Sequence, residues 1–228
     1  MTEKEKFAPV RGVIFDLDGT LAYTMEDLKS AMNYMLRFYG FPERTTEQLL
    51  AAINHGGRVF VKRSLPPEKA EDESFLDEAY AVYHEHYLAD PVEKTVLYDG
   101  FDKVFGLLEK RGIVSAVCTN KETDVAKRIA AKLFPGKVSL IIGGEKRFRS
   151  KPAPDGVNYI CSELGLDPAT ILYVGDSGVD MHTARNAGVR AVWCSWGYAK
   201  RDAFPEIEPD FIASVPTDIC DIIEKCSG

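Results

Sequence analysis

Hydrophobic residues recur along this 228-residue chain in two patterns, and the change between them divides the sequence into segments. Residues 11–16, RGVIFD, form a short β-branched and aromatic run that ends at an acidic turn, which is typical of a buried strand leading into a loop. From about Met25 to Leu88, apolar residues instead recur at helical spacing, with no clear strand between them. The pattern therefore predicts one strand followed by a block of amphipathic helices.

Helix-like and strand-like blocks alternate after residue 100, and the strands are predicted at IVSAVCT, VSLIIGG, ILYVGD and RAVWCSW. This order predicts an α/β fold with a Rossmann-like parallel sheet flanked by helices. We expect the first strand to join that sheet, so that residues 22–98 form an all-helical cap inserted into a core of residues 1–21 and 99–228. Ligands of such sheets bind beyond the carboxyl ends of the strands, where we therefore expect the chemistry.

Composition narrows the class of protein. With 45% apolar and 28% charged residues, and no segment near the roughly 20 apolar residues of a membrane span, we expect a soluble protein that binds no membrane. The N-terminal residues are unlike a secretory signal, and five scattered cysteines without a C-x-x-C pair suit a reducing compartment, which favours the cytoplasm. The net charge is -7 and no long Lys/Arg run is present, so nucleic acid is not an expected partner.

Acidic residues follow two of the predicted strands. Asp16 and Asp18 come after the first strand, and two carboxylates two positions apart in extended chain can face one pocket and share a cation. A surface turn and a D-x-D-G calcium loop are alternatives, but a calcium loop follows a helix and ends in a Glu, and no Glu follows here until Glu26. Asp176 ends a second apolar strand, and Asp180 begins a predicted helix, where a plain helix cap is the alternative. Together these carboxylates predict an oxygen-ligand site, which Mg²⁺ typically occupies when phosphate also binds.

Polar residues at two further places suit a phosphate group. Thr119 and Asn120 end a strand before a helix predicted to begin near Glu122, which brings a hydroxyl, an amide and free backbone N–H groups together; an ordinary helix cap is the alternative. Lys151 precedes Pro152, whose ring restricts the backbone and helps to direct the ammonium group. A solvated surface lysine is the alternative for Lys151.

The ordered segments FDLDGTL, TN, KPAPDG and GDSGVD resemble the four motifs of the haloacid dehalogenase superfamily. The resemblance covers the whole chain, because the helical block between the first two motifs is similar to the cap of the phosphoglycolate phosphatase-like branch. Local sequences such as NHGGR, YDGF and VCTNKE resemble that branch too. Two positions depart from the family pattern: Tyr23 where an acidic residue is frequent, and Gly156 where the third motif often has another Pro.

The resemblance implies a magnesium-dependent phosphatase that hydrolyses small phosphate monoesters through an aspartyl-phosphate on Asp16, with Asp18 as general acid and base. It implies that the Asp16 and Asp176 carboxylates and the Asp18 backbone carbonyl hold Mg²⁺, with Asp180 behind them. Phosphate would be bound by Thr119, Asn120, Lys151 and the backbone amides of Leu17 and Asp18.

Substrate choice is expected to lie in the cap, where Gly57 and Arg58 form a candidate substrate-facing loop. A basic, solvent-exposed helix face is the alternative for Arg58. The resemblance makes 2-phosphoglycolate the leading candidate among small phosphorylated metabolites, and we expect a monomer or a homodimer.

Two other functions use the same fold. A phosphomutase, like β-phosphoglucomutase, returns the phosphoryl group to a sugar, but the histidine that such mutases carry after the first motif is missing between Leu21 and Lys29. A dehalogenase would lack the aspartate at Asp18. A non-catalytic small-molecule binder would have lost a catalytic group, whereas the carboxylates and the lysine of the motifs are all present.

Overall fold

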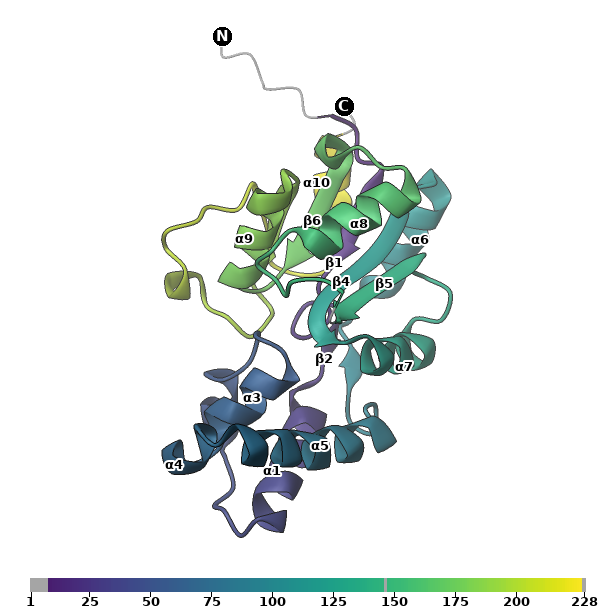
Figure 1. Ribbon diagram of the computed structural model, residues 1–228. Coiled ribbons are helices and arrows are strands. Elements are labelled where there is room, and N and C mark those ends of the chain that lie inside the picture. The colour runs from purple at the N-terminus through teal and green to yellow at the C-terminus, as the bar shows by residue number, and fades with distance from the viewer. Residues whose placement is uncertain (1–7, 146, 227–228) are drawn as a thin grey trace.

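The computed structural model describes residues 8–145 and 147–226. Its centre is a parallel six-stranded sheet in the order β5-β4-β1-β6-β7-β8, which confirms the predicted α/β class (Figure 1). In chain order the strands are β1 (Gly12–Phe15), β4 (Val114–Glu122), β5 (Leu140–Gly144), β6 (Ile171–Gly175), β7 (Arg190–Cys194) and β8 (Phe211–Ala213). The predicted first strand is therefore central, between β4 and β6.

Helices cover both faces of the sheet, which explains why the central strands are almost wholly apolar. In β1, Val13 and Phe15 face one layer of the core and Ile14 faces the other, and all three side chains are buried. The first layer holds α6 (Phe101–Arg111), α7 (Thr123–Leu133) and α10 (Asp218–Lys225), and the second holds α8 (Asp155–Leu164) and α9 (Gly178–Ala187).

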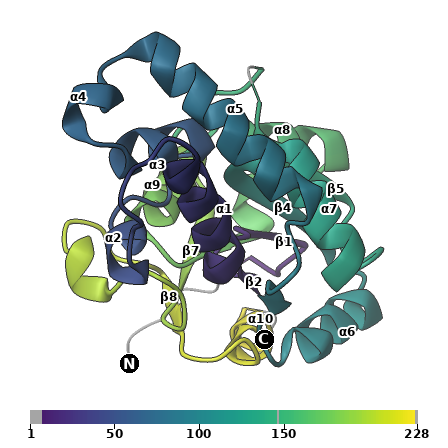
Figure 2. The same cartoon turned by 90° about the horizontal axis from the view of Figure 1, so that it is seen from below.

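The segment between β1 and α6 forms a separate layer of helices beneath the carboxyl ends of the strands (Figure 1). Its helices are α1 (Met25–Phe38), α2 (Thr46–Leu50), α3 (Gly57–Ser64), α4 (Pro67–Ala70) and α5 (Glu73–Ala89). Seen from below, α1, α3 and α5 lie in front of the sheet (Figure 2). No helix among residues 8–145 and 147–226 is long and apolar enough to cross a membrane.

Several short elements are not predicted by the hydrophobic pattern. Strands β2 (Ala22–Tyr23) and β3 (Val96–Leu97) pair antiparallel where the chain enters and leaves the helical layer. No element is expected beyond Trp196, yet β8 and α10 complete the core there, although Ile219, Ile222 and Ile223 of α10 do recur at helical spacing. Two 3₁₀ turns lie at Pro168–Thr170 and Arg201–Ala203. Strands of two or three residues are too short to display an alternation of apolar and polar positions.

A buried carboxylate ties the two ends of the helical layer together. Asp27, in the first turn of α1, accepts hydrogen bonds from the backbone N–H groups of Lys94 and Thr95 and from the Thr95 hydroxyl. The side chain of Asp27 is buried, so these donors have little access to water if it is removed. Asp27 thus closes the helical layer next to the β2–β3 pair.

The Asp27→Ala substitution should lower the free energy of unfolding by about 2 to 4 kcal/mol, because buried donors would lose their acceptor. Urea unfolding followed by circular dichroism measures this loss. Glu43→Ala is the matched control, since it breaks only the exposed ion pair with Arg37 and should change stability by less than about 0.5 kcal/mol. Equal effects of the two substitutions would contradict the role given to Asp27.

Candidate active site

Three buried carboxylates meet at the carboxyl edge of the sheet. Oxygens of Asp16, Asp176 and Asp180 lie within 4.8 Å of one another. Asp16 and Asp176 follow β1 and β6, which are neighbouring parallel strands and therefore end side by side. Asp180 reaches the same place from the first turn of α9. Its Oδ2 accepts hydrogen bonds from the backbone N–H and the hydroxyl of Ser177. Asp180 is therefore both the third helical residue of a capping box with Ser177 and a member of the cluster.

Lys151 supplies the positive charge of this cluster. Its ammonium lies 2.9 Å from Asp16 Oδ1 and 2.7 Å from Asp180 Oδ1, and its side chain is only 5% exposed. The ammonium also donates to the Tyr173 hydroxyl at 3.1 Å. The alternative of a solvated surface lysine is thus excluded by its burial.

Asn120 holds the backbone of Lys151 through a pair of hydrogen bonds. Its side-chain amide donates to the Lys151 carbonyl at 3.1 Å and accepts from the Lys151 N–H at 2.8 Å. The same amide donates to the Asn54 carbonyl at 3.0 Å. Its side chain, predicted to contact phosphate, is thus occupied with the protein backbone, whereas buried Thr119 beside it lines the pocket.

The cluster carries more negative than positive charge. Burial raises the pKa of Asp16 from 3.8 to about 6, although Lys151 opposes the shift. Burial, and then the neighbouring Asp180 charge, raise the pKa of Asp176 well above its usual range. For Lys151, burial lowers the pKa, but the charges of Asp16 and Asp180 outweigh it and raise the value. Carboxylate oxygens in this number and at this spacing fit a hard divalent cation such as Mg²⁺.

Asp18 lies apart from these three carboxylates. Its Oδ1 pairs with the ammonium of Lys121 at 3.2 Å and accepts a hydrogen bond from the Thr24 hydroxyl. Thr24 is in turn bound by Tyr198, whose hydroxyl accepts from the Thr24 N–H at 2.8 Å. The backbone N–H of Tyr198 donates to Asp176 Oδ2 at 2.6 Å, which links the two groups of carboxylates. Leu17, between Asp16 and Asp18, has a fully buried side chain, so only its backbone can face a ligand.

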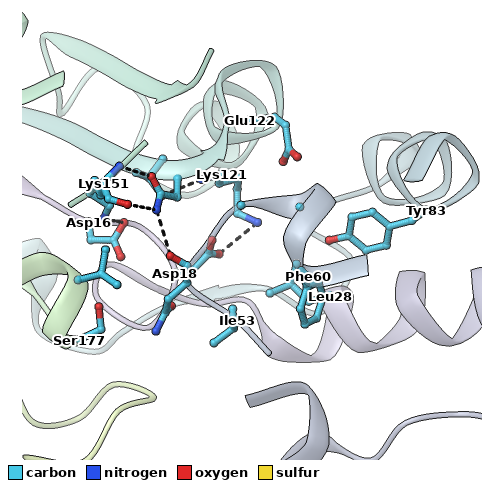
Figure 3. A pocket seen from close by; sticks show the side chains of 16 residues that line it. Asp16, Asp18, Leu28, Ile53, Phe60, Tyr83, Lys121, Glu122, Lys151 and Ser177 are labelled. Carbon is cyan, nitrogen blue, oxygen red and sulfur yellow. Dashed lines mark hydrogen bonds and ion pairs between the residues drawn. The ribbon is translucent and has the colours of Figure 1, made fainter. Parts of the chain in front are cut away.

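A pocket of about 490 Å³ lies between this edge of the sheet and the helical layer. Figure 3 shows Asp16 and Lys151 at one end and Tyr83, from α5, at the other. The remaining lining residues come from both layers and are Asp18, Leu28, Ile53, Asn54, Gly56, Gly57, Phe60, Thr119, Asn120, Lys121, Glu122, Ser177 and Val179. The pocket thus places apolar side chains opposite a polar, charged base.

The family assignment follows from a family model, the haloacid dehalogenase-like hydrolase, which matches residues 13–194. The chain belongs to the haloacid dehalogenase-like hydrolase family. A phosphoglycolate phosphatase from Aquifex aeolicus is 31% identical over 217 residues, which are 95% of this chain and 98% of that protein. The N-acetylmuramic acid 6-phosphate phosphatase of Pseudomonas aeruginosa is 28% identical, over 95% of this chain and 96% of that protein.

A solved structure agrees with these sequence relatives. The crystal structure of a predicted phosphoglycolate phosphatase from Haemophilus somnus 129PT superposes with a TM-score of 0.84 at 28% identity, covering 93% of this chain and 97% of that one. The chain is therefore a phosphoric monoester hydrolase of the phosphoglycolate phosphatase-like branch, as the motifs predict.

The predicted specificity residues of this haloacid dehalogenase-like hydrolase lie in different places. Gly57 lines the pocket, and a Cβ there would lie 2.3 Å from Oε1 of the flexible Glu122 side chain, which would have to move. Arg58 is not among the residues that line the pocket, and its role in substrate choice stays a prediction. Its guanidinium is 43% exposed and pairs instead with Glu73 and Asp77 of α5, at 2.6 and 2.9 Å.

Three residues that the motifs leave without a role also belong to the site: Lys121, Thr24 and Tyr198. Strand β4 runs three residues beyond the predicted IVSAVCT and ends at Glu122, which puts Lys121 within the sheet. Glycine at 143 makes this possible, because a Cβ there would lie 2.4 Å from the Lys121 carbonyl oxygen. The sequence signal for Lys121 and Tyr198 was their position just after the apolar part of a strand.

Because its pKa is raised on folding, Asp16 favours the folded state only while it is protonated. That contribution is complete below pH 3.8 and is lost as the pH rises through about 6. In EDTA, the stability of Asp16→Asn relative to the wild type should therefore increase between pH 4 and pH 7, by on the order of 1 to 3 kcal/mol. Urea unfolding at several pH values measures the difference. The exposed Asp102→Asn control should show no such trend, and a pH-independent difference for Asp16→Asn would contradict the assignment.

Proposed function

We propose that this hydrolase removes phosphate from small phosphate monoesters with the help of Mg²⁺, through an aspartyl-phosphate on Asp16. The observation that carries the proposal is the cluster of Asp16, Asp176, Asp180 and Lys151, of which Asp16 and Lys151 line the pocket. Asp18 lines the same pocket but stands outside the cluster, as an acid and base separate from the nucleophile would.

The charge of the cluster supports a role for the metal. The Asp16 and Asp176 carboxylates and the Asp18 backbone carbonyl would hold Mg²⁺, and Asp180 would orient the site from behind. When bound, Mg²⁺ would offset the repulsion between a carboxylate nucleophile and a dianionic phosphate. Without it, Lys151 is the one cation that pairs with these three carboxylates among residues 8–145 and 147–226.

The chain's own groups would divide the reaction into two steps. In the first, a carboxylate oxygen of Asp16 attacks phosphorus while Asp18 gives a proton to the departing ester oxygen. In the second, Asp18 takes a proton from the water that attacks the aspartyl-phosphate. Thr119 and the backbone amides of Leu17 and Asp18 would bind the transferring oxygens, and Lys151 would balance their charge.

We propose 2-phosphoglycolate as the first substrate to test, because several similar bacterial proteins are named phosphoglycolate phosphatase.

We also propose that residues 22–98 act as a cap over a core of residues 1–21 and 99–228. Supporting this, the pocket is lined from both layers and the chain passes between them next to the β2–β3 pair. A cytoplasmic monomer or homodimer acting on a small phosphorylated metabolite remains our proposal, and size-exclusion chromatography with light scattering tests the assembly.

Purified protein should release phosphate from 2-phosphoglycolate or from 4-nitrophenyl phosphate in Mg²⁺ and lose that activity in EDTA. Asp16→Asn should lower kcat by about 10³-fold or more, because it removes the nucleophile. Asp18→Asn should lower kcat by about 10²- to 10⁴-fold, the usual contribution of general acid–base catalysis. The Asp102→Asn control should keep wild-type activity. Activity that persists in EDTA or in Asp16→Asn would contradict the mechanism.

The covalent intermediate can be observed directly. Rapid acid quenching after mixing with a ³²P-labelled substrate should leave label on the protein that hydroxylamine releases, as it does from acyl phosphates. Peptide mapping should place the label on Asp16. Label on another residue, or none during steady turnover, would argue for direct attack by water.

A further inference from the structure

Asp18 is held at only one of its two carboxylate oxygens. Both donors, the Lys121 ammonium and the Thr24 hydroxyl, bind Oδ1. Within residues 8–145 and 147–226, no group forms a hydrogen bond or an ion pair with Oδ2. Asp18 also lines the pocket beside Asp16. The fixed oxygen therefore sets the direction in which the other one points.

Lys121 is a strongly constrained cation. Its side chain is only 3% exposed, and the ammonium lies 3.2 Å from Asp18 Oδ1, on the pocket side of β4 (Figure 3). The same ammonium donates to the Tyr87 hydroxyl at 2.9 Å and lies 4.5 Å from the centre of the Tyr87 ring. Because Tyr87 belongs to α5, Lys121 contacts the sheet and the helical layer at once.

An ion pair that only joined these layers would contribute little net stability, because removing both charges from water offsets much of their attraction. Of the described residues that line the pocket, Lys121 and Lys151 are the basic ones, and Lys151 is already bound to Asp16 and Asp180. A buried ammonium beside a carboxylate that must move protons has a direct use, since it fixes the geometry of that carboxylate.

We propose that Lys121 is a positioning residue for the reaction, which together with Thr24 fixes Asp18 Oδ1 so that Oδ2 carries the proton to the departing oxygen. This inference rests on the proposed phosphatase function. Tyr87 makes the arrangement depend on the helical layer, because it holds the Lys121 ammonium from α5.

If Lys121 positions Asp18, losing it should slow the steps in which Asp18 gives or takes a proton. In the first step the Asp16 oxygen–phosphorus bond forms, the ester phosphorus–oxygen bond breaks, and the proton on Asp18 Oδ2 passes to the departing oxygen. In the second, water oxygen bonds to phosphorus, its proton passes to Oδ2, and Asp16 is released. A departing alkoxide needs the proton of the first step far more than 4-nitrophenolate does, because it is a much stronger base.

The experiment compares first-step rates for these two kinds of ester. With enzyme in excess over substrate and saturating Mg²⁺, release of the alcohol is followed in a single turnover for 4-nitrophenyl phosphate and for 2-phosphoglycolate. The proteins are wild type, Lys121→Met, Lys121→Arg, Tyr87→Phe and the control Lys137→Met, which loses only a surface ion pair with Glu109.

Lys121→Met should slow the alkyl ester about 10- to 100-fold but 4-nitrophenyl phosphate only about threefold, because only the alkyl ester depends on a well-placed proton donor. Lys121→Arg should recover part of the loss, since it keeps the charge. Tyr87→Phe should show a smaller effect with the same preference, and it carries the test if Lys121→Met does not fold. Lys137→Met should match the wild type.

Other outcomes would overturn the inference. An equal loss for both esters in Lys121→Met and Tyr87→Phe would make the contact merely structural. A rise in KM for 2-phosphoglycolate alone, at unchanged single-turnover rate, would make Lys121 a ligand of the substrate carboxylate. Both results leave the proposed phosphatase chemistry intact, whereas a wild type inactive on every ester would overturn the function as well.

Discussion

The burial of three carboxylates around one ammonium is the constraint on which this structure depends. Asp16, Asp176 and Asp180 reach the same point from β1, β6 and α9, and in the part of the chain that the structure describes Lys151 is the one cation paired with them. Such a group is costly to remove from water unless its partners are held in place. Adjacent parallel strands, the Asn120 brace on Lys151 and the Ser177 contacts of Asp180 all serve that requirement. The fold therefore holds like charges close together at the point where we propose that a divalent cation and a phosphate bind.

The main architecture could be predicted from sequence because its signals are local and repeated. The apolar strands before Asp16 and Asp176 are continuous runs, and the αβ alternation after residue 100 fixes the sheet type. Parallel strands end at one edge, so strand-end carboxylates converge without any knowledge of loops. Lys151 was recognisable only from its place in the motif order, because a single lysine in a loop has no periodic signal.

What the sequence could not provide depends on contacts between distant segments. Arg58 pairs with Glu73 and Asp77 of α5, and no sequence pattern reveals which helix packs beside α3. Strands β2, β3 and β8 are short, and pairing with neighbours defines them rather than composition. The partnership of Lys121 with Asp18 likewise appears only when β4 is extended alongside β5.

The end of β4 has a consequence for the divergence of this family. Three consecutive residues there each contact the helical layer: Asn120 the Asn54 carbonyl, Lys121 the Tyr87 hydroxyl, and Glu122 the Tyr80 hydroxyl. The helical layer is continuous in sequence and begins and ends near one strand pair, so a recombination event could exchange it as a block. A helical layer taken from another protein would, however, contact a β4 end whose sequence does not match it. New substrate ranges would then arise most readily when both segments change together, so lineages should inherit the two as a matched pair although about twenty residues of chain separate them.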